Sequence, residues 1–220
     1  FVDATSPAIA RGRPKLQDGS GAWQSLAVQD LWDVCIAASL SSLLRESLPH
    51  THVVLVPSPK DLLADPVFPQ APLSDRLHAS FDPDIRPRVH LLPNPATFSF
   101  RNVTFGTTGA DPLFDLARRQ ITKHSSTPPP DLVGRTAAHL LEQRSFYPVF
   151  PPDQDTPLDL SLYPHVELPC SPDVLLLPSA LTPKLMPINN ATLLVAPGTA
   201  VRGGMAAREP GFFATLHIQP

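Results

Sequence analysis

The sequence predicts an α/β (α+β) protein in which a mixed β-sheet is flanked by helices. In the first half of the chain, short apolar runs rich in β-branched residues alternate with helical patterns, which is typical of parallel strands joined by helices. Towards the end of the chain, candidate strands follow one another with only turns between them, and the two patterns together point to a mixed sheet with helices packed on it. The chain also contains 29 prolines among its 220 residues, and this density limits it to short helices and strands separated by many loops.

The composition excludes several classes of protein. Hydrophobic residues make up 42% of the chain, enough to fill the core of one ordinary domain. Its 20 acidic and 17 basic residues give a net charge of -3, which argues against a sequence-independent grip on nucleic acid, so any DNA contact is expected to be indirect at most. No uncharged apolar run is long enough to predict a membrane span. The two cysteines are too few for a disulfide framework and lack zinc-site spacing, as in a reducing compartment.

In the first half, an amphipathic helix is predicted over residues 23–48, because apolar residues recur there every three or four positions. Pro49 ends it. Its predicted buried face consists of Leu26, Leu31, Val34, Cys35, Ala38, Leu43 and Leu44. The apolar run at 52–56 predicts a strand, and its lack of alternation indicates that both faces are covered. A long, irregular crossover over 61–88 leads to a second predicted strand at 89–92.

The second half is divided by turn and breaker residues into shorter elements. The predicted elements are a hairpin over 97–107, helices over 113–120 and 132–143, and strands over 172–178, 192–196 and 212–218. Asp111 is predicted to cap the first of these helices, with Pro112 at its first position. Residues 125–130 are predicted to form a loop, and a Pro-Ser turn is expected to end the strand at 172–178.

Several segments carry a resemblance to a known family when they are taken together and in order. They are residues 54–61 (VLVPSPKD), 66–72 (PVFPQAP), 106–114 (GTTGADPLF), 143–152 (QRSFYPVFPP) and 168–179 (LPCSPDVLLLPS), followed by Ala196-Pro197-Gly198. The opening Phe1-Val2-Asp3-Ala4 is similar to the end of that family's Gly-Pro-Phe-x-Asp segment. The chain resembles the B (accessory, second-largest) subunits of the replicative DNA polymerases alpha, delta and epsilon, and the alpha branch most closely.

The resemblance implies an inactivated calcineurin-like phosphoesterase fold. Active phosphoesterases of this type hold two metal ions with Asp, His and Asn ligands at strand ends. After the first strand, where an active relative has Gly-Asn-His-Asp, this chain has Ser58, Pro59, Lys60 and Asp61. After the strand at 172–178, where an active relative has Gly-His-x-His, it has Pro178, Ser179, Ala180 and Leu181. A single carboxylate, Asp61, cannot hold a metal pair, so we expect no catalytic residues, no metal and no cofactor.

The resemblance also implies a function. It predicts a non-catalytic scaffold subunit of the DNA polymerase alpha-primase complex that acts in the initiation of DNA replication in the nucleus. Its expected partners are the zinc-bearing C-terminal region of the catalytic subunit and, through the complex, the primase subunits. Residues 1–220 are expected to form one phosphoesterase-like domain that is incomplete at both ends, with an oligonucleotide-binding-type (OB) domain preceding it outside this chain.

Two alternative functions remain open from the sequence. One is a B subunit of polymerase delta or epsilon, which shares the architecture but has another partner. The other is a divergent metal-dependent phosphoesterase. For the partner contact, Phe146, Tyr147 and Phe150 are candidates, because aromatic side chains dominate interface hot spots. Packing of these aromatic residues beneath the proline-rich loop is the other interpretation.

One further pattern has two interpretations. His50 and His52 form a His-x-His pattern, which on a strand places both rings on one face, as metal ligands require. Pro49 precedes them, and no Cys or third His lies near them in the sequence, which favours a loop with solvated imidazoles.

Overall fold

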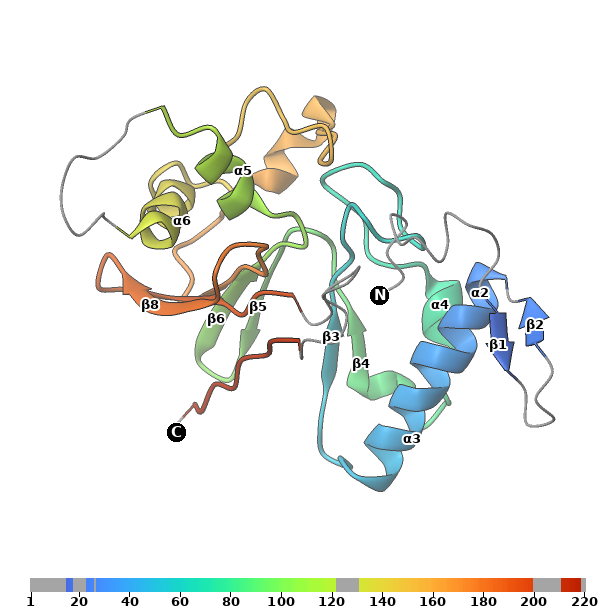
Figure 1. The fold of residues 1–220 in the computed structure, drawn as a ribbon. Helices are drawn as coiled ribbons and strands as arrows, with labels where there is room; N and C mark the ends of the chain where they lie inside the picture. Colours follow the sequence, from blue (N-terminus) through green and yellow to red (C-terminus); the bar gives the residue numbers. More distant parts are fainter. Residues whose placement is uncertain (1–14, 18–22, 26, 122–130, 200–210, 219–220) are drawn as a thin grey trace. The chain divides into compact units, whose positions relative to one another are not determined.

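The structure is a computed structural model that describes residues 15–17, 23–25, 27–121, 131–199 and 211–218 (Figure 1). The chain divides into two compact units, which are described separately. Unit 1 comprises Phe1–Pro66 and Gln70–Pro93, and unit 2 comprises Val67–Pro69 and Asn94–Pro220. The family-like segment at residues 1–4 and the loop expected at 125–130 lie outside the described residues.

Unit 1 contains a helical segment and two pairs of short strands. Its strands are β1 (Lys15–Gln17), β2 (Trp23–Ser25), β3 (Val53–Leu55) and β4 (Val89–Leu91), and its helices are α2 (Val28–Leu31), a π-helical turn (Trp32–Ala37), α3 (Ala38–Glu46), α4 (Asp75–Ala79) and a 3-10 turn (Arg86–Arg88). β1 and β2 are antiparallel, whereas β3 and β4 are parallel. The prediction that the helix begins at residue 23 is wrong, because residues 23–25 pair with β1.

The π-helical turn changes which side of the first helix is buried. Trp32 and Ala37 are five residues apart and both buried, and the buried positions then continue to Ser41 and Leu44. A π turn inserts one residue into the helical repeat, so the apolar stripe read from the sequence with ordinary spacing is displaced. The predicted face is therefore wrong at four positions that are exposed in the structure, namely Val34, Cys35, Ala38 and Leu43.

Among the described residues, an apolar cluster covers one face of the parallel pair β3–β4. Val53, Leu55, Val89 and Leu91 belong to the same apolar cluster as Trp32 of the helical segment, which runs alongside the pair (Figure 1). Side chains alternate along a strand, so Val54 points to the other face, where it is 39% exposed. The two predicted strands are confirmed, but the expectation that both faces of the first are covered is wrong.

Unit 2 is built on a five-stranded mixed sheet. Its strands are β5 (Ala96–Phe100), β6 (Val103–Thr107), β7 (Val174–Leu176), β8 (Lys184–Ile188) and β9 (Thr192–Ala196), in the spatial order β5-β6-β7-β9-β8. β6, β7 and β9 are mutually parallel, and the outer strands β5 and β8 are antiparallel to their neighbours. The predicted hairpin, the mixed sheet and the strand at 192–196 are confirmed. β7 lies within the strand predicted at 172–178, and its central residue Leu175 is fully buried.

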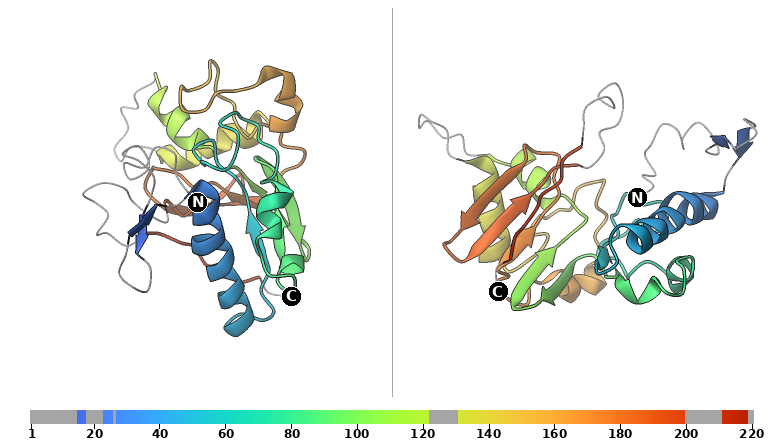
Figure 2. Two further views of the ribbon diagram at one scale, coloured as in Figure 1. Left: turned by 90° about the vertical axis from the view of Figure 1, so that its right-hand side faces the viewer. Right: turned by 90° about the horizontal axis from the view of Figure 1, so that it is seen from below.

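Helices cover a face of this sheet. α5 (Pro112–Arg118) and α6 (Leu132–Glu142) confirm the two predicted helices, and a 3-10 helix spans Leu160–Val166. α6 lies alongside the sheet and contacts β8 (Figures 1 and 2). Gly134 permits this approach, since a Cβ atom there would lie 2.9 Å from Cε of Met186. Leu113, Leu140, Leu175 and Leu194 are fully buried between the two layers.

The end of the sheet differs from the prediction. Residues 211–218 form no strand, so the strand predicted at 212–218 is wrong. The fifth strand is instead β8, which pairs with β9 from Lys184↔Ala196 to Ile188↔Thr192. β8 contains Pro187, which has no backbone N–H and is tolerated because β8 is an edge strand.

Candidate functional site at the carboxyl ends of the strands

The loop after β3 in unit 1 carries the first set of positions expected to be degenerate metal ligands. Asp61 is only 4% exposed, and its Oδ1 accepts a hydrogen bond of 3.2 Å from the backbone N–H of Leu63. The backbone N–H of Asp61 in turn donates to the carbonyl of Ser58 at 2.8 Å. Pro59 is buried and Lys60 is exposed. Through its Oδ1, the carboxylate of Asp61 therefore holds a turn of its own backbone.

Gln70 closes the same loop from a distance in sequence. Its amide Nε2 donates to the carbonyl of Ser58 at 3.1 Å and to the carbonyl of Asp65 at 2.6 Å. Gln70 is itself buried, so these bonds satisfy a side-chain donor that would be costly to leave unpaired. The loop from Ser58 to Asp65 is thereby fixed by buried hydrogen bonds.

The turn after β7 in unit 2 carries the second set. Pro178 is exposed, Ser179 is buried and Leu181 is half-buried. Oγ of Ser179 accepts a hydrogen bond of 3.1 Å from the backbone N–H of Leu181, which braces the turn. At this position, where an active relative would carry a metal ligand, the hydroxyl instead binds the backbone of its own turn.

Asp111 connects this turn with the helix that follows β6. Its Oδ1 accepts a hydrogen bond of 3.0 Å from the backbone N–H of Phe114 and so caps α5, as the sequence predicted. Its Oδ2 accepts a hydrogen bond of 2.7 Å from the backbone N–H of Ala180. One carboxylate thus ties together the chain segments that leave the carboxyl ends of two adjacent parallel strands, β6 and β7.

Asn94 holds the segment between β6 and α5 in place. It is completely buried, and its Oδ1 accepts hydrogen bonds from Oγ1 of Thr108 at 2.9 Å and from the backbone N–H of Gly109 at 2.8 Å. Oγ1 of Thr108 accepts in turn from the backbone N–H of Ala110 at 3.1 Å. Sequence reasoning missed this role of Asn94. Its only local signal was the Asn94-Pro95 dipeptide, which marks a turn.

Three polar side chains at the strand ends of unit 2, those of Asp111, Ser179 and Asn94, hold loops through backbone hydrogen bonds. Both oxygens of the Asp111 carboxylate accept backbone hydrogen bonds. Oγ of Ser179 accepts one within its own turn, and Oδ1 of Asn94 accepts one from Gly109, in the segment between β6 and α5. The Ser58 to Asp61 loop belongs to unit 1 and the Pro178 to Leu181 turn belongs to unit 2. Among the residues that the structure describes, no three His, Cys, Asp or Glu side chains converge as a metal-binding group.

The candidate partner-binding aromatics differ in their exposure. Phe146 and Tyr147 lie in the core of unit 2, as the packing interpretation requires. The Tyr147 hydroxyl donates a hydrogen bond of 2.6 Å to Oδ2 of the buried Asp115 and accepts one of 3.2 Å from the backbone N–H of Asp153. Burial raises the pKa of Tyr147, and the bond to Asp115 raises it further. Of the three aromatics, only Phe150, at 77% exposed, is available to a partner in this structure.

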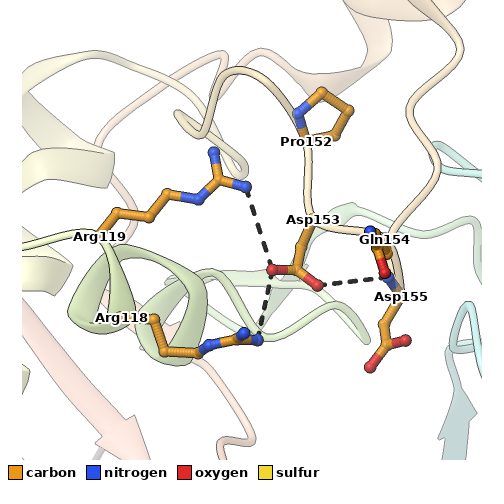
Figure 3. Close-up of a pocket in the computed structure, with 6 residues that line it drawn as sticks. All are labelled: Arg118, Arg119, Pro152, Asp153, Gln154 and Asp155. Atoms are coloured by element: carbon orange, nitrogen blue, oxygen red, sulfur yellow. Dashed lines mark hydrogen bonds and ion pairs between the residues drawn. The ribbon is translucent and has the colours of Figure 1, made fainter.

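A pocket of about 480 Å³ opens beside this loop, between it and the end of α5 (Figure 3). Both arginines that line it, Arg118 and Arg119, turn their guanidinium groups toward the carboxylate of Asp153, at 3.4 Å and 4.0 Å. Arg119 also donates to the carbonyl of Pro151. Oδ1 of Asp153 accepts from the backbone N–H of Asp155 at 3.3 Å. Both arginines of the pocket therefore pair with Asp153, and the two carboxylates that line it, Asp153 and Asp155, balance their charges.

The remaining sequence candidates lie in unit 1. His50 is exposed in the turn before β3. His52 is also exposed, and its ring contacts His90 of β4 and not His50. In the described part of the chain, no helix has the length and apolar character needed to cross a membrane.

Comparison with known proteins indicates the same family as the segments that carry the resemblance. The family model for the B subunit of DNA polymerase alpha/epsilon matches residues 2–184. The DNA polymerase alpha B subunit of Bos taurus is 38% identical over 134 residues, which cover 60% of this chain and 21% of that protein. The protein of that name from Mus musculus is 32% identical over 170 residues, covering 77% and 27% respectively. That from Drosophila melanogaster is 28% identical over 193 residues, covering 87% and 29%.

This chain therefore spans between 21% and 29% of the length of these three relatives. The family match covers both loops described above, from the Ser58 turn to the Ser179 turn, and most of the sheet of unit 2. The chain belongs to the family of DNA polymerase alpha/epsilon B subunits.

Proposed function

We propose that the chain acts as a non-catalytic accessory subunit of DNA polymerase alpha in the initiation of DNA replication in the nucleus. The observation that carries the proposal is the family match over residues 2–184, together with relatives in cow, mouse and fly that are all named as the B subunit of DNA polymerase alpha. These relatives also favour the alpha assignment over the delta or epsilon alternative. The mildly acidic chain fits a subunit that contacts its partner proteins more than the DNA itself.

We infer further that the chain is an inactivated phosphoesterase-like domain. The support comes from the chemistry of its strand ends, where a two-metal enzyme needs several oxygen and nitrogen ligands free to converge on ions roughly 3.5–4 Å apart. Here Asp111 and Ser179 use their oxygens to hold backbone N–H groups, and Pro178 offers no ligand atom. A loop fixed in this way is suited to present a constant surface.

The partner in this proposal is the C-terminal region of the polymerase alpha catalytic subunit, with the primase subunits held through the complex. Of the three candidate aromatics, Phe150 is the one placed to take part, because it is 77% exposed and follows the buried pair Phe146 and Tyr147 that fixes its loop. A large aromatic anchor on a rigid loop binds without a large loss of conformational entropy.

A competitive pull-down tests the proposal. The C-terminal regions of the alpha, delta and epsilon catalytic subunits are immobilised separately, and the purified chain is expected to be retained by the alpha region and displaced only by soluble alpha region. Phe150→Ala is expected to reduce retention, with Phe100→Ala, another exposed phenylalanine, as the matched control. Preferential retention by the delta or epsilon region would refute the alpha assignment, and equal effects of the two variants would remove Phe150 from the interface.

A further inference from the structure

The register of the two parallel strands in unit 1 brings a pair of histidines together. Val53 of β3 lies opposite Val89 of β4, and Val54 lies opposite His90. His52 immediately precedes β3, so by strand alternation its side chain lies on the same face as those of Val54 and His90. This is the face turned away from the apolar cluster that contains Trp32, and both histidines on it are exposed.

The two rings meet through their nitrogens. Nδ1 of His52 lies 2.9 Å from Nε2 of His90, while the ring centroids are 5.2 Å apart and the ring planes are inclined by 20°. The centroid separation equals the nitrogen separation plus about two ring radii, so both nitrogens lie close to the line between the ring centres. Each nitrogen therefore directs its in-plane hydrogen or lone pair toward the other ring.

We propose that His52 and His90 form a two-histidine site for a divalent transition-metal cation of the Zn²⁺, Ni²⁺ or Cu²⁺ class. Imidazole nitrogen is a common protein ligand for these ions. Two nitrogens that bind the same cation, each at about 2.0–2.1 Å, lie roughly 2.9–3.4 Å apart for bond angles from octahedral to tetrahedral. The observed separation of 2.9 Å falls at the short end of that range. The site needs only a turn of each exposed ring outward from the nitrogen-nitrogen line, and water completes the coordination.

The proton balance of binding is simple. In the hydrogen-bonded pair, one of the two facing nitrogens carries a hydrogen and the other accepts it. When a cation enters, the donating ring takes the tautomer with its hydrogen on the remote nitrogen, so that both facing nitrogens offer lone pairs. A protonated ring must release its proton to solvent, so binding weakens on acidification.

The neighbouring groups leave this pair accessible. The cationic side chain that immediately precedes β4, that of Arg88, is turned toward the carbonyls of Leu44, Leu48 and Pro49, to which its Nη1 donates at 3.0–3.1 Å. His50 is exposed in the preceding turn and provides a natural control, since it lies two residues from His52 but takes no part in the pair.

The test is isothermal titration of the protein, prepared without a histidine tag, with Zn²⁺ and separately with Ni²⁺. The wild-type protein is expected to show a site that His52→Ala and His90→Ala each weaken at least tenfold, whereas His50→Ala leaves its affinity unchanged. Binding should be lost at acidic pH. With Cu²⁺ as the probe, electron paramagnetic resonance should show two imidazole nitrogens in the wild-type protein and one in either single variant.

Both substituted side chains are exposed, so the variants are expected to keep the fold, which far-UV circular dichroism and the thermal midpoint check. Zn²⁺ affinity that survives in both His52→Ala and His90→Ala would overturn the proposal. So would an equal loss in His50→Ala, because the site would then not be the pair across β3 and β4.

Discussion

The hydroxyl of Tyr147 donates a hydrogen bond of 2.6 Å to the buried carboxylate of Asp115 on α5. The same hydroxyl accepts a hydrogen bond from the backbone N–H of Asp153, so one side chain connects α5 with the proline-rich loop that contains Asp153. This loop also carries the exposed Phe150, whose position therefore depends on a buried polar contact.

Tyr147→Phe is expected to lower the free energy of unfolding by about 1–3 kcal/mol, because it removes the hydroxyl and leaves the buried Asp115 carboxylate without that donor. Urea unfolding at neutral pH measures the change. Tyr163→Phe is the matched control, since Tyr163 is 41% exposed. Equal effects of the two substitutions would show that the Asp115 contact does not stabilise the fold.

The stability of the protein should depend on pH through Asp115. Burial is the main cause that raises the pKa of Asp115 above 3.8, and the hydrogen bond from Tyr147 only partly opposes it. A carboxyl group whose pKa is raised by folding contributes stability that is fully present below its unfolded pKa and is lost as the pH rises through the folded pKa.

Asp115→Asn has no such ionisation. Relative to the wild type, the variant is therefore expected to be more stable at about pH 7 than at about pH 3.5. Urea unfolding of both proteins at the two pH values measures this difference. A relative stability that is the same at both, or lower at neutral pH, would contradict the assigned direction of the shift.

Asp111→Ala is expected to destabilise unit 2 by about 1–3 kcal/mol, because the carboxylate both caps α5 and binds the backbone of Ala180. The control is Asp131→Ala at the start of α6, where the side chain makes no capping hydrogen bond and pairs with a partly exposed Lys184 at 3.6 Å. Chemical denaturation of both variants should give a clearly smaller loss for Asp131→Ala. A larger loss for Asp131→Ala would contradict the role given to Asp111.

Gly106→Ala tests the packing of β6 against the core. A Cβ atom at this position would lie 3.3 Å from Cε1 of Phe146 and 3.3 Å from Cγ of Pro172, closer than ordinary contact. The expected cost is about 1–3 kcal/mol, measured as a lower midpoint of thermal or urea unfolding. Ser99→Ala, at an exposed position on the neighbouring β5, should change stability by less than about 0.5 kcal/mol. A neutral Gly106→Ala would show that the core yields at this point.

The elements that the sequence predicted well have local signals. α5 begins where Asp111 and Pro112 supply a cap and a suitable first residue, and the structure shows that capping bond. β9 coincides with the predicted run at 192–196, whose apolar and β-branched residues favour a buried strand. In these segments the preference of a few neighbouring residues agrees with the tertiary structure.

The errors arise where distant residues decide. The buried face of the first helix is displaced by the π-helical turn from Trp32 to Ala37, which no ordinary helical repeat anticipates. β8 was missed because Pro187 interrupts its pattern, and a proline fits there only because β8 is an edge strand. Residues 212–218 alternate like a strand, yet in the described part of the chain they join no ladder.

The candidate site was predictable in part. The family resemblance located the loops at Ser58 to Asp61 and Pro178 to Leu181, and residue chemistry alone indicated that they are poor metal ligands. The bond from Ala180 to Asp111 joins residues 69 positions apart, and the bond from Thr108 to Asn94 joins the two ends of the β5–β6 hairpin. Such contacts depend on the strand order of the sheet, which the sequence pattern did not determine.

In the proposed function, the side chains at these strand ends hold loops and take no part in metal-dependent hydrolysis. Hydrolysis of bis-p-nitrophenyl phosphate by the purified protein with added manganese tests it most directly, with Asp61→Asn measured in parallel. Both proteins are expected to hydrolyse the ester only at the rate of manganese in buffer. Manganese-dependent turnover by the wild type that Asp61→Asn abolishes would contradict the claim and restore the phosphoesterase alternative.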